Sequence, residues 1–172
     1  STEYYGGTPD SSTPASLLTD PSGNIISWAL VRSTDIHGNR IDYSYAVQRD
    51  NGRSSSRETG KNRYPTRITY NGQGAQAGTS SIDFIRDRDL GESRRSDVRI
   101  DYSAGFKMVT ADLLRRIEVR YRGTMVRHYD LSYNTAAFHQ TVLTGITEFG
   151  SDGSELAGHE FNYHELPSGD FS

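Results

Sequence analysis

The chain has 172 residues, a formal net charge of −3 at pH 7 and no cysteine. This length suits one domain, or two small ones, and the lack of cysteine excludes disulfides, thiolate metal sites and thiol catalysis. The negative charge argues against nucleic acid as a main partner, and no apolar run is long enough to predict a membrane-spanning helix.

The N-terminal segment, residues 1–22, is rich in Ser, Thr, Pro, Asp and Gly, and we interpret it as an extended, loosely ordered lead-in. We assign residues 23–166 to a single β-rich domain and residues 167–172 to a polar tail. Because the chain does not begin with Met, we interpret it as a piece of a longer protein whose targeting is left open.

The clearest structural signal is a β-hairpin near the start of this domain. Apolar and polar residues alternate over residues 25–31 and again over residues 40–47, as in strands with one buried face. Between them, residues 35–39 read Asp-Ile-His-Gly-Asn, a composition typical of a tight turn. The pattern predicts two antiparallel strands joined by that turn.

Further short strands are predicted at residues 64–70, 81–85, 98–102, 117–121, 125–133, 141–149 and 156–163. Residues 49–62 and 71–80 lack periodicity and are predicted to be mobile loops, while residues 105–116 are ambiguous and could form a helical turn or two. With about nine strands at short intervals, the sequence predicts an all-β fold. Antiparallel hairpins would form a twisted sheet or a β-sandwich with long polar loops.

Short motifs follow one another in a defined order over residues 28–163. They are Trp28-x-Leu30, Asp35-x-x-Gly38-Asn39-x-Ile41-x-Tyr43-x-Tyr45, Tyr64-Pro65-x-x-Ile68-x-Tyr70, Ile82-x-Phe84 with Arg86-Asp87-Arg88-Asp89, Leu113-Leu114-x-x-Ile117-x-Val119, Tyr129-x-Leu131-x-Tyr133, Leu143-x-x-Ile146 and Phe161-x-Tyr163. In this order they resemble the N-terminal region of SpvB-like virulence proteins. The B components of insecticidal toxin complexes (TcaC and TcdB types) share that region, and the same phrases recur in Rhs and YD-repeat proteins.

This resemblance implies a structural role in a secreted bacterial toxin or virulence protein. In the toxin-complex B components such β-rich segments build part of a large hollow shell, and in the SpvB-like proteins the enzymatic activity belongs to a separate domain. The resemblance therefore implies partners among the flanking domains of the parent polypeptide or a cognate toxin-complex subunit. It transfers no catalytic residue and no cofactor to this chain.

Four consecutive charged residues, Arg86, Asp87, Arg88 and Asp89, form a compact cluster. One interpretation is a polar network that locks neighbouring repeats together, or a docking patch. The other is a solvated loop, whose ion pairs contribute roughly 0–1 kcal/mol each.

Aromatic residues on the predicted strands raise a second possibility for function. Exposed rings in a row could stack on sugars, and the candidates are Trp28, Tyr43, Tyr45, Tyr70, Tyr129 and Tyr133. The alternative is cross-strand packing, worth about 0.2–1 kcal/mol per pair. The rings share their predicted faces with Ile and Leu, which favours packing for most of them.

Metal-binding patterns are weak. His159-Glu160 and His164 resemble a zinc signature, but their spacing is five rather than four and the segment is predicted to be a strand. The sets Asp20-x-x-Gly23-Asn24 and Asp35-x-x-Gly38-Asn39 lack the ligand density of a calcium loop and match turn chemistry. We expect no metal and no cofactor.

The sequence thus predicts a non-enzymatic structural module of a larger toxin or virulence protein, packed against the rest of its parent chain. The alternative is a carbohydrate- or surface-binding β-module that uses exposed aromatic residues to bind a glycan. An enzyme is disfavoured, because no acid, base and nucleophile converge in the pattern.

Overall fold

The computed structural model describes residues 1–9, 11–53 and 57–163. This part of the chain has fifteen strands, three short 3₁₀ helices and no α-helix. The strands are β1 (Thr2–Tyr5), β2 (Gly7–Thr8), β3 (Ser11–Ser12), β4 (Leu17–Thr19), β5 (Ile25–Trp28), β6 (Leu30–Thr34), β7 (Asn39–Asp50), β8 (Gly60–Gln73), β9 (Ser80–Arg86), β10 (Arg99–Asp101), β11 (Met108–Thr110), β12 (Leu114–Tyr121), β13 (Thr124–Thr135), β14 (Thr141–Gly150) and β15 (Glu155–Glu160). The 3₁₀ helices are η1 (Pro14–Ser16), η2 (Asp87–Leu90) and η3 (Ala137–His139).

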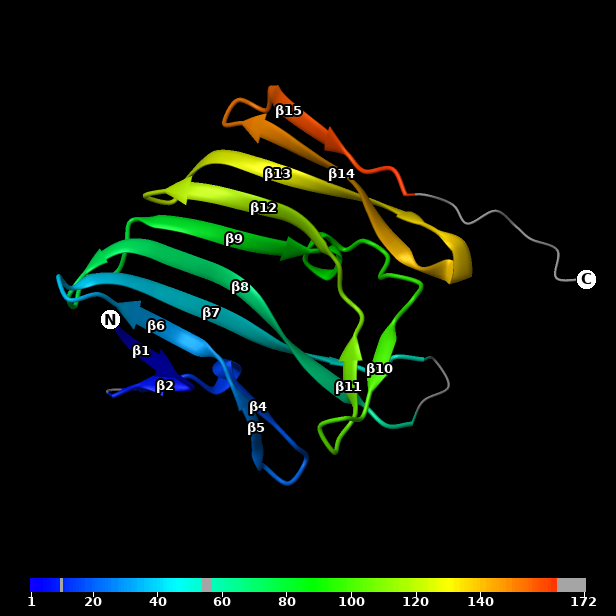
Figure 1. The fold of residues 1–172 in the computed structure, drawn as a ribbon, viewed down its shortest axis with the longest axis horizontal. Helices are drawn as coiled ribbons and strands as arrows, with labels where there is room; N and C mark the ends of the chain where they lie inside the picture. Colours follow the sequence, from blue (N-terminus) through cyan, green and yellow to red (C-terminus); the bar gives the residue numbers. More distant parts are fainter. Residues whose placement is uncertain (10, 54–56, 164–172) are drawn as a thin grey trace, which may run out of the picture.

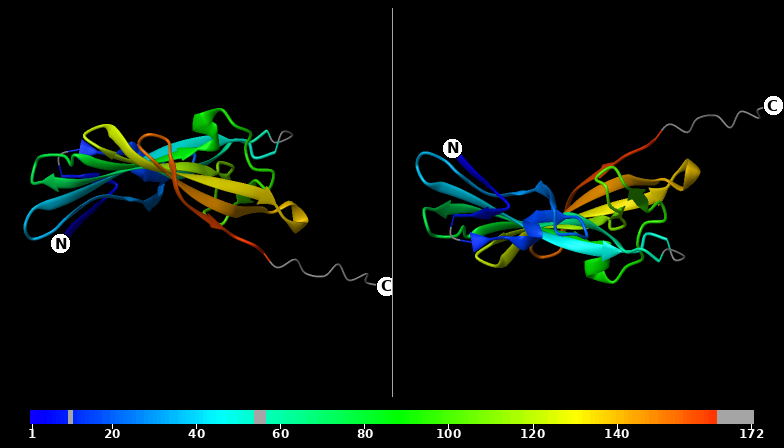
Figure 2. Two further views of the ribbon diagram at one scale, coloured as in Figure 1. Left: turned by 90° about the horizontal axis from the view of Figure 1, so that it is seen from above. Right: turned by 90° about the horizontal axis from the view of Figure 1, so that it is seen from below.

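One large sheet dominates the molecule, with strand order β1-β6-β7-β8-β9-β12-β13-β14-β15 (Figure 1). All neighbours along this path are antiparallel. Beside it, β10 and β11 form a short antiparallel pair, and β11 joins β8 in parallel through Met108 and Lys61. Seen edge-on, the sheet is one thin, twisted layer (Figure 2). The predicted all-β antiparallel sheet is confirmed, in its twisted-sheet rather than its sandwich form.

The predicted first hairpin is present, but its outer strand is divided at Ala29. Residues Ile25–Trp28 form β5 and pair with β4, whereas Leu30–Thr34 form β6 and pair with β1 and β7. Ala29 donates its N–H to the Ser16 carbonyl, and its own carbonyl accepts from the Gly6 N–H. Its backbone groups therefore belong neither to the β4–β5 ladder nor to the β6–β7 ladder. The turn at residues 35–39 lies where it was predicted.

The N-terminal lead-in is more ordered than the composition of residues 1–22 indicates. It forms β1 to β4, and β1 hydrogen-bonds to β6 inside the main sheet. Thr2, Tyr4 and Tyr5 are residue types that favour strands. Backbone pairing with the edge of β6 then stabilises β1, although the residues that follow favour turns. The upper boundaries of the predicted domain and tail, residues 166 and 167, lie outside the described residues.

The two predicted loops are shorter than expected, and the segment left ambiguous at residues 105–116 contains strand rather than helix. The ladder between β7 and β8 continues through Arg49–Lys61 and Asp50–Gly60, so the two ends of the predicted loop at 49–62 are paired strand, whereas residues 51–53 and 57–59 lie between the strands. Strand β8 likewise runs on to Gln73, into the segment predicted to be a flexible loop. In the ambiguous segment, Met108–Thr110 form β11 rather than a helical turn. The β-branched Val109 is 1% exposed there and pairs with Ile100, while the neighbouring Met108 pairs with the distant Lys61 on β8.

The core is small and lies at one end of the sheet, where β11 and the β4–β5 hairpin approach β6 and β8. In the described part of the chain the buried hydrophobic residues are Leu18, Ala29, Val31, Phe106, Val109, Ala111 and Leu113. Strands β12 to β15 contribute none of them. Among the described residues, most of the sheet is therefore a single layer.

Candidate functional site: the two faces of the sheet

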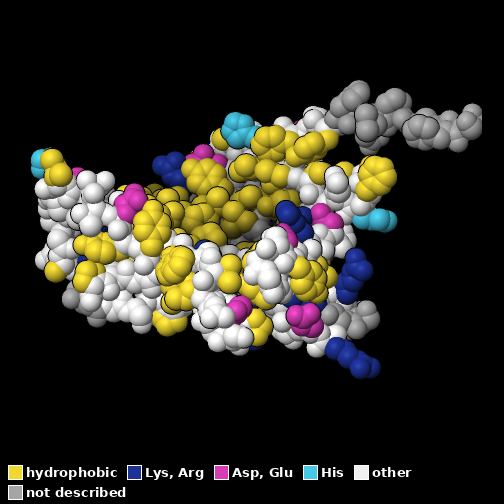
Figure 3. Space-filling view, turned by 60° about the horizontal axis from the view of Figure 1, so that its bottom comes forward, with side chains coloured by type: hydrophobic (Ala, Val, Ile, Leu, Met, Phe, Trp, Pro, Cys, Tyr) yellow, Lys and Arg dark blue, Asp and Glu magenta, His cyan; other side chains and the backbone are white. Residues whose placement is uncertain are grey.

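One face of the sheet is apolar. The cross-strand register places Tyr43 opposite Ile68, Ile68 opposite Ile82, and Ile82 opposite Val119. The adjoining rows on the same face contain Phe84, Ile117, Tyr129, Leu131, Ile146, Tyr133 and Leu143. Every one of these residues is half-buried rather than buried. Figure 3 shows hydrophobic side chains gathered in a hollow on this side of the molecule.

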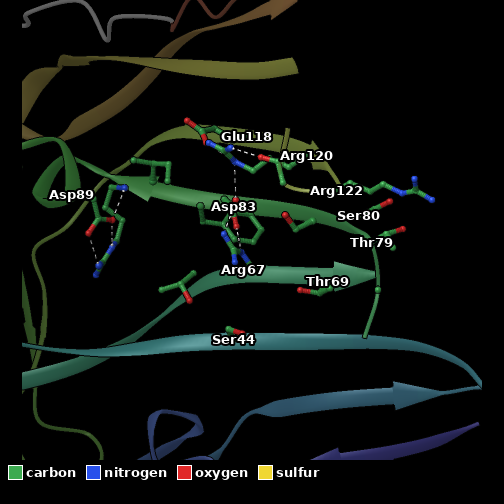
Figure 4. A pocket seen from close by; sticks show the side chains of 17 residues that line it. Ser44, Arg67, Thr69, Thr79, Ser80, Asp83, Asp89, Glu118, Arg120 and Arg122 are labelled. Atoms are coloured by element: carbon green, nitrogen blue, oxygen red, sulfur yellow. Dashed lines mark hydrogen bonds and ion pairs between the residues drawn. The ribbon is translucent and has the colours of Figure 1, made fainter. Parts of the chain in front are cut away.

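The opposite face is polar and carries a ladder of ion pairs across the strands. Asp83 on β9 pairs with Arg67 on β8 and with Arg120 on β12, at 3.3 Å for the latter, and Arg120 also binds Glu118 at 2.6 Å (Figure 4). These residues and a row of Ser and Thr hydroxyls line a shallow groove of about 740 Å³. Each arginine of the ladder already has a carboxylate partner. Cross-strand ion pairs of this kind are typical of a sheet face that meets water, so we interpret this face as the solvent-facing one.

The ladder extends in both directions along this polar face. Asp42 pairs with Arg32 at 2.8 Å and with Arg40 at 2.6 Å, and Arg116 pairs with Asp130 at 2.6 Å. The two faces of the sheet therefore differ sharply, because alternate residues of each strand are apolar on one side and charged on the other.

Five of the six aromatic residues considered for a possible platform lie on the apolar face, and one of them, Tyr70, is on β8 two residues after Ile68. Tyr43 and Tyr45 are on β7, and Tyr129 and Tyr133 are on β13. The Tyr45 and Tyr133 hydroxyls donate to backbone carbonyls of Leu30 and Leu114, at 2.8 and 2.7 Å. Trp28 lies apart from them on β5, outside the main sheet, with 55% of its surface exposed.

The predicted polar cluster forms ion pairs with other segments of the chain and is not a solvated loop. Arg86 and Asp87 are buried, whereas Arg88 and Asp89 are exposed. Arg86 binds Asp89 at 3.0 Å and Asp112 at 2.9 Å, and Arg88 binds Asp112 at 3.0 Å. The cluster thereby ties η2 to the segment between β11 and β12. A docking role for it remains a prediction.

Sequence reasoning missed two members of this cluster. Asp50, at the end of β7, pairs with Arg88 at 3.2 Å and with Arg94 at 2.8 Å. Asp112 is entirely buried as a side chain. These partners are 24 to 44 residues away along the chain, and no local pattern marks them. Asp87 is distinct, because one of its carboxylate oxygens is buried and has no hydrogen-bond partner among the described residues, and burial raises the pKa of this group.

The two Asp-x-x-Gly-Asn turns have the same geometry. In each, the aspartate accepts one bond from the Asn backbone N–H and one from the Asn side-chain amide, at 2.8 and 2.8 Å for Asp20 and at 2.9 and 2.6 Å for Asp35. The glycines, Gly23 and Gly38, have φ of +90° and +80°. The carboxylates thus serve the turn itself, as its chemistry predicts.

The remaining metal candidate is incomplete. His159 lies exposed on β15, and His164 falls outside the described residues. Within residues 1–9, 11–53 and 57–163, no group of three or more His, Asp or Glu side chains is placed to hold a metal ion. The same residues contain no helix with the length and apolar character needed to cross a membrane.

Comparisons with known proteins identify the fold. No protein-family model and no curated protein matches the sequence. Among solved structures, TcdB2–TccC3 covers 95% of this chain with a TM-score of 0.74 and 18% identity. The Tc holotoxin pore of Photorhabdus luminescens covers 94% with a TM-score of 0.72 and 18% identity. The N-terminal domain of the effector protein SpvB from Salmonella typhimurium covers 80% with a TM-score of 0.66 and 18% identity.

The chain has the fold of the SpvB N-terminal domain. The resemblance predicted from the motifs is confirmed at the level of the fold. The chain spans 10% of each of the two toxin-complex chains and 56% of the SpvB chain that it matches. The SpvB-like fold is thus found inside much longer polypeptides.

Proposed function

We propose that this SpvB-like domain is a non-enzymatic structural module of a larger secreted bacterial toxin or virulence protein. It packs against the rest of its parent chain through the apolar face of the sheet, and it forms part of a β-rich shell or scaffold. The observation that carries this proposal is the apolar face, whose Ile, Leu, Phe and Tyr side chains are only half-buried in the described part of the chain.

The exposed surface of the molecule supports a missing partner. The Ile, Leu, Phe and Tyr side chains of the apolar face are only half-buried in the described part of the chain. Fully burying an exposed Ile or Phe contributes about 1.5–3 kcal/mol, and a packing partner would gain the part of this that the chain itself does not supply.

In this proposal the two faces of the sheet have different surroundings. The polar face, with its ladder from Arg32 to Asp130, stays in water, while the apolar face is covered. Free strand edges on β1 and β15 are natural places for neighbouring segments to join the sheet, because their outer backbone groups are unpaired in the described chain. The partner is then the flanking sequence or a cognate toxin-complex subunit.

Cysteine labelling tests the proposal directly, since the chain has no cysteine of its own. Ile82 and Ser81 are neighbours on β9 that face opposite sides of the sheet. We expect Ile82→Cys to react with a maleimide in the isolated chain but to be protected in the longer parent polypeptide. Ser81→Cys should react in both. Equal reactivity of Ile82→Cys in the two proteins would disprove the packing role.

Glycan binding is the second candidate, and Trp28 is the observation that favours it. This ring is 55% exposed and lies apart from the aliphatic rows. The tyrosines offer less support, because Tyr45 and Tyr133 commit their hydroxyls to backbone carbonyls. Glycan-array binding that is lost in Trp28→Ala, with the β-sheet circular dichroism unchanged, would support this function over the packing role.

A further inference from the structure

A second cavity, which we call the lysine pocket, is lined by residues of the β4–β5 turn, the start of β8 and the segment before β11. Figure 1 shows these three segments near one another at one end of the molecule. Its volume is about 420 Å³, within the range of small-ligand sites. Its charged and aromatic walls are Asp20, Arg49, Glu58, Lys61, Phe106 and Lys107. The pocket is separate from the apolar face and from the polar groove.

The basic residues of this pocket are unusual for the chain. Lysine occurs only twice in the sequence, against seventeen arginines, and both lysines line this one pocket. Lys107 is 2% exposed, and its ammonium donates to the carbonyls of Asn51 and Glu58, at 2.9 and 2.7 Å. Lys107 therefore fixes the wall of the pocket.

Lys61 has donor capacity left over. Its ammonium lies 3.1 Å from the Thr19 hydroxyl and 5.7 Å from the centre of the Phe106 ring. An ammonium has three N–H donors, so at least one is available to a ligand. Neither Lys61 nor Arg49 forms an ion pair with a carboxylate in the described residues, whereas Arg67, Arg116 and most other arginines do.

The electrostatics of the pocket favour an incoming anion. Burial lowers the pKa of Lys61, and the nearby Arg49 lowers it further, while Asp20 opposes both. The Asn24 hydrogen bonds keep the Asp20 carboxylate ionised in the β4–β5 turn, yet the walls carry three cations, Arg49, Lys61 and Lys107, against the two carboxylates of Asp20 and Glu58. Two neighbouring cations in a partly desolvated site are both stabilised when an anion lies between them.

We propose that the lysine pocket binds a compact oxyanion, the phosphate or carboxylate group of a small ligand, between the Lys61 ammonium and the Arg49 guanidinium. Lysine suits a phosphate or carboxylate oxygen as a point charge, and arginine adds paired N–H donors. The carboxylates of Asp20 and Glu58 on the walls select against extended polyanions such as nucleic acid. This proposal is independent of the packing role of the apolar face.

Titration of the isotope-labelled chain by NMR tests this site. Inorganic phosphate and, separately, acetate are added at constant ionic strength, with chloride as the balancing anion. We expect saturable shifts of the backbone amides of Thr19, Lys61 and Phe106, and a rise in the Lys61 side-chain pKa on saturation. Saturation by phosphate alone identifies a phosphate site, by acetate alone a carboxylate site, and by both a site for either group.

Variants separate this site from general ionic effects. Arg49 is exposed, so Arg49→Gln should keep the fold and weaken binding about tenfold or more, which is a loss of about 1.4 kcal/mol. Lys61→Gln should abolish saturation and Lys61→Arg should retain it. Arg122→Gln, at the β12–β13 turn, is the matched control and should bind normally. Shifts that never saturate, or that are unchanged in Arg49→Gln, would overturn the proposal.

Discussion

Asp112 shows how much one buried carboxylate contributes to this fold. Its side chain is fully buried, and it binds both Arg86, at 2.9 Å, and Arg88, at 3.0 Å. Removing it leaves the buried Arg86 guanidinium without its nearest buried counter-charge. We expect Asp112→Ala to reduce the free energy of unfolding by about 3–5 kcal/mol.

Asp130 is the matched control for that substitution. Its pair with Arg116 is partly exposed on both sides, at 37% and 33%. Asp130→Ala should therefore cost only about 0–1 kcal/mol. Urea unfolding of both variants measures the difference, and equal losses would mean that burial of the ion pair does not decide its contribution.

A second carboxylate, Asp97, makes stability depend on pH. Its pairing with Arg95, together with bonds from the Thr141 hydroxyl and N–H, holds the pKa of Asp97 well below its ordinary value of 3.8, although burial opposes this. A carboxylate with a lowered folded-state pKa stabilises the fold above its unfolded pKa and loses that effect as the pH falls.

We therefore expect Asp97→Asn to lower the free energy of unfolding near pH 7 by about 1–2 kcal/mol, after allowance for partial exposure. The difference from the parent chain should shrink as the pH falls through 3.8 and below. Denaturant unfolding over a pH series measures it. A difference that stays constant with pH would show that Asp97 acts through packing instead.

At the scale of the hairpin, the Asp-x-x-Gly-Asn turn is both the best sequence signal and a testable unit. Asp35 accepts bonds from the His37 and Asn39 backbone N–H groups, at 2.8 and 2.9 Å. Asp35→Ala should remove these bonds and speed hydrogen exchange of the β6–β7 amides near the turn.

The repeated turn supplies the control. Asp20→Ala removes the same bonds from the β4–β5 hairpin, which lies outside the main sheet. Its faster exchange should be confined to β4 and β5. If both variants change exchange throughout the sheet, these turns are not local units.

The elements also show where sequence reasoning succeeds and fails. Alternation predicted the returning half of the first hairpin and the strands around Ile117, Tyr129 and Ile146, because one face of each is apolar. It failed at the two ends of residues 49–62, where β7 and β8 pair through polar residues and Gly60. Gly60 is required there by tertiary contact, since a Cβ would lie 2.5 Å from a Val109 methyl carbon. Such a contact leaves no local pattern.

The candidate site was only half visible in the sequence. The apolar rows of the strands were predicted, and cross-strand packing of the tyrosines follows from them. Their uncovered state was not predicted, because a strand with one apolar face reads the same whether that face meets another layer of its own chain or a partner. The lysine pocket was missed for a related reason, since Thr19, Arg49, Lys61 and Phe106 come together only in the fold.

For the whole molecule, a single-layer sheet has a consequence that can be measured on the isolated chain. An exposed, contiguous apolar face should bind the dye ANS while the sheet remains folded, as monomeric proteins with covered cores do not. We expect bright ANS emission in the native state, together with an intact β-sheet circular dichroism spectrum. Emission should fall when the longer parent polypeptide replaces the isolated chain.

Two substitutions localise the dye to one face. Ile82→Asp places a charge in the centre of the apolar rows and should reduce ANS emission strongly. Thr69→Asp, on the polar face opposite Ser81, should leave the emission unchanged. If the native chain binds no dye, or if the two variants behave alike, the apolar face is covered by the chain itself. Packing of this face against a parent polypeptide would then be contradicted.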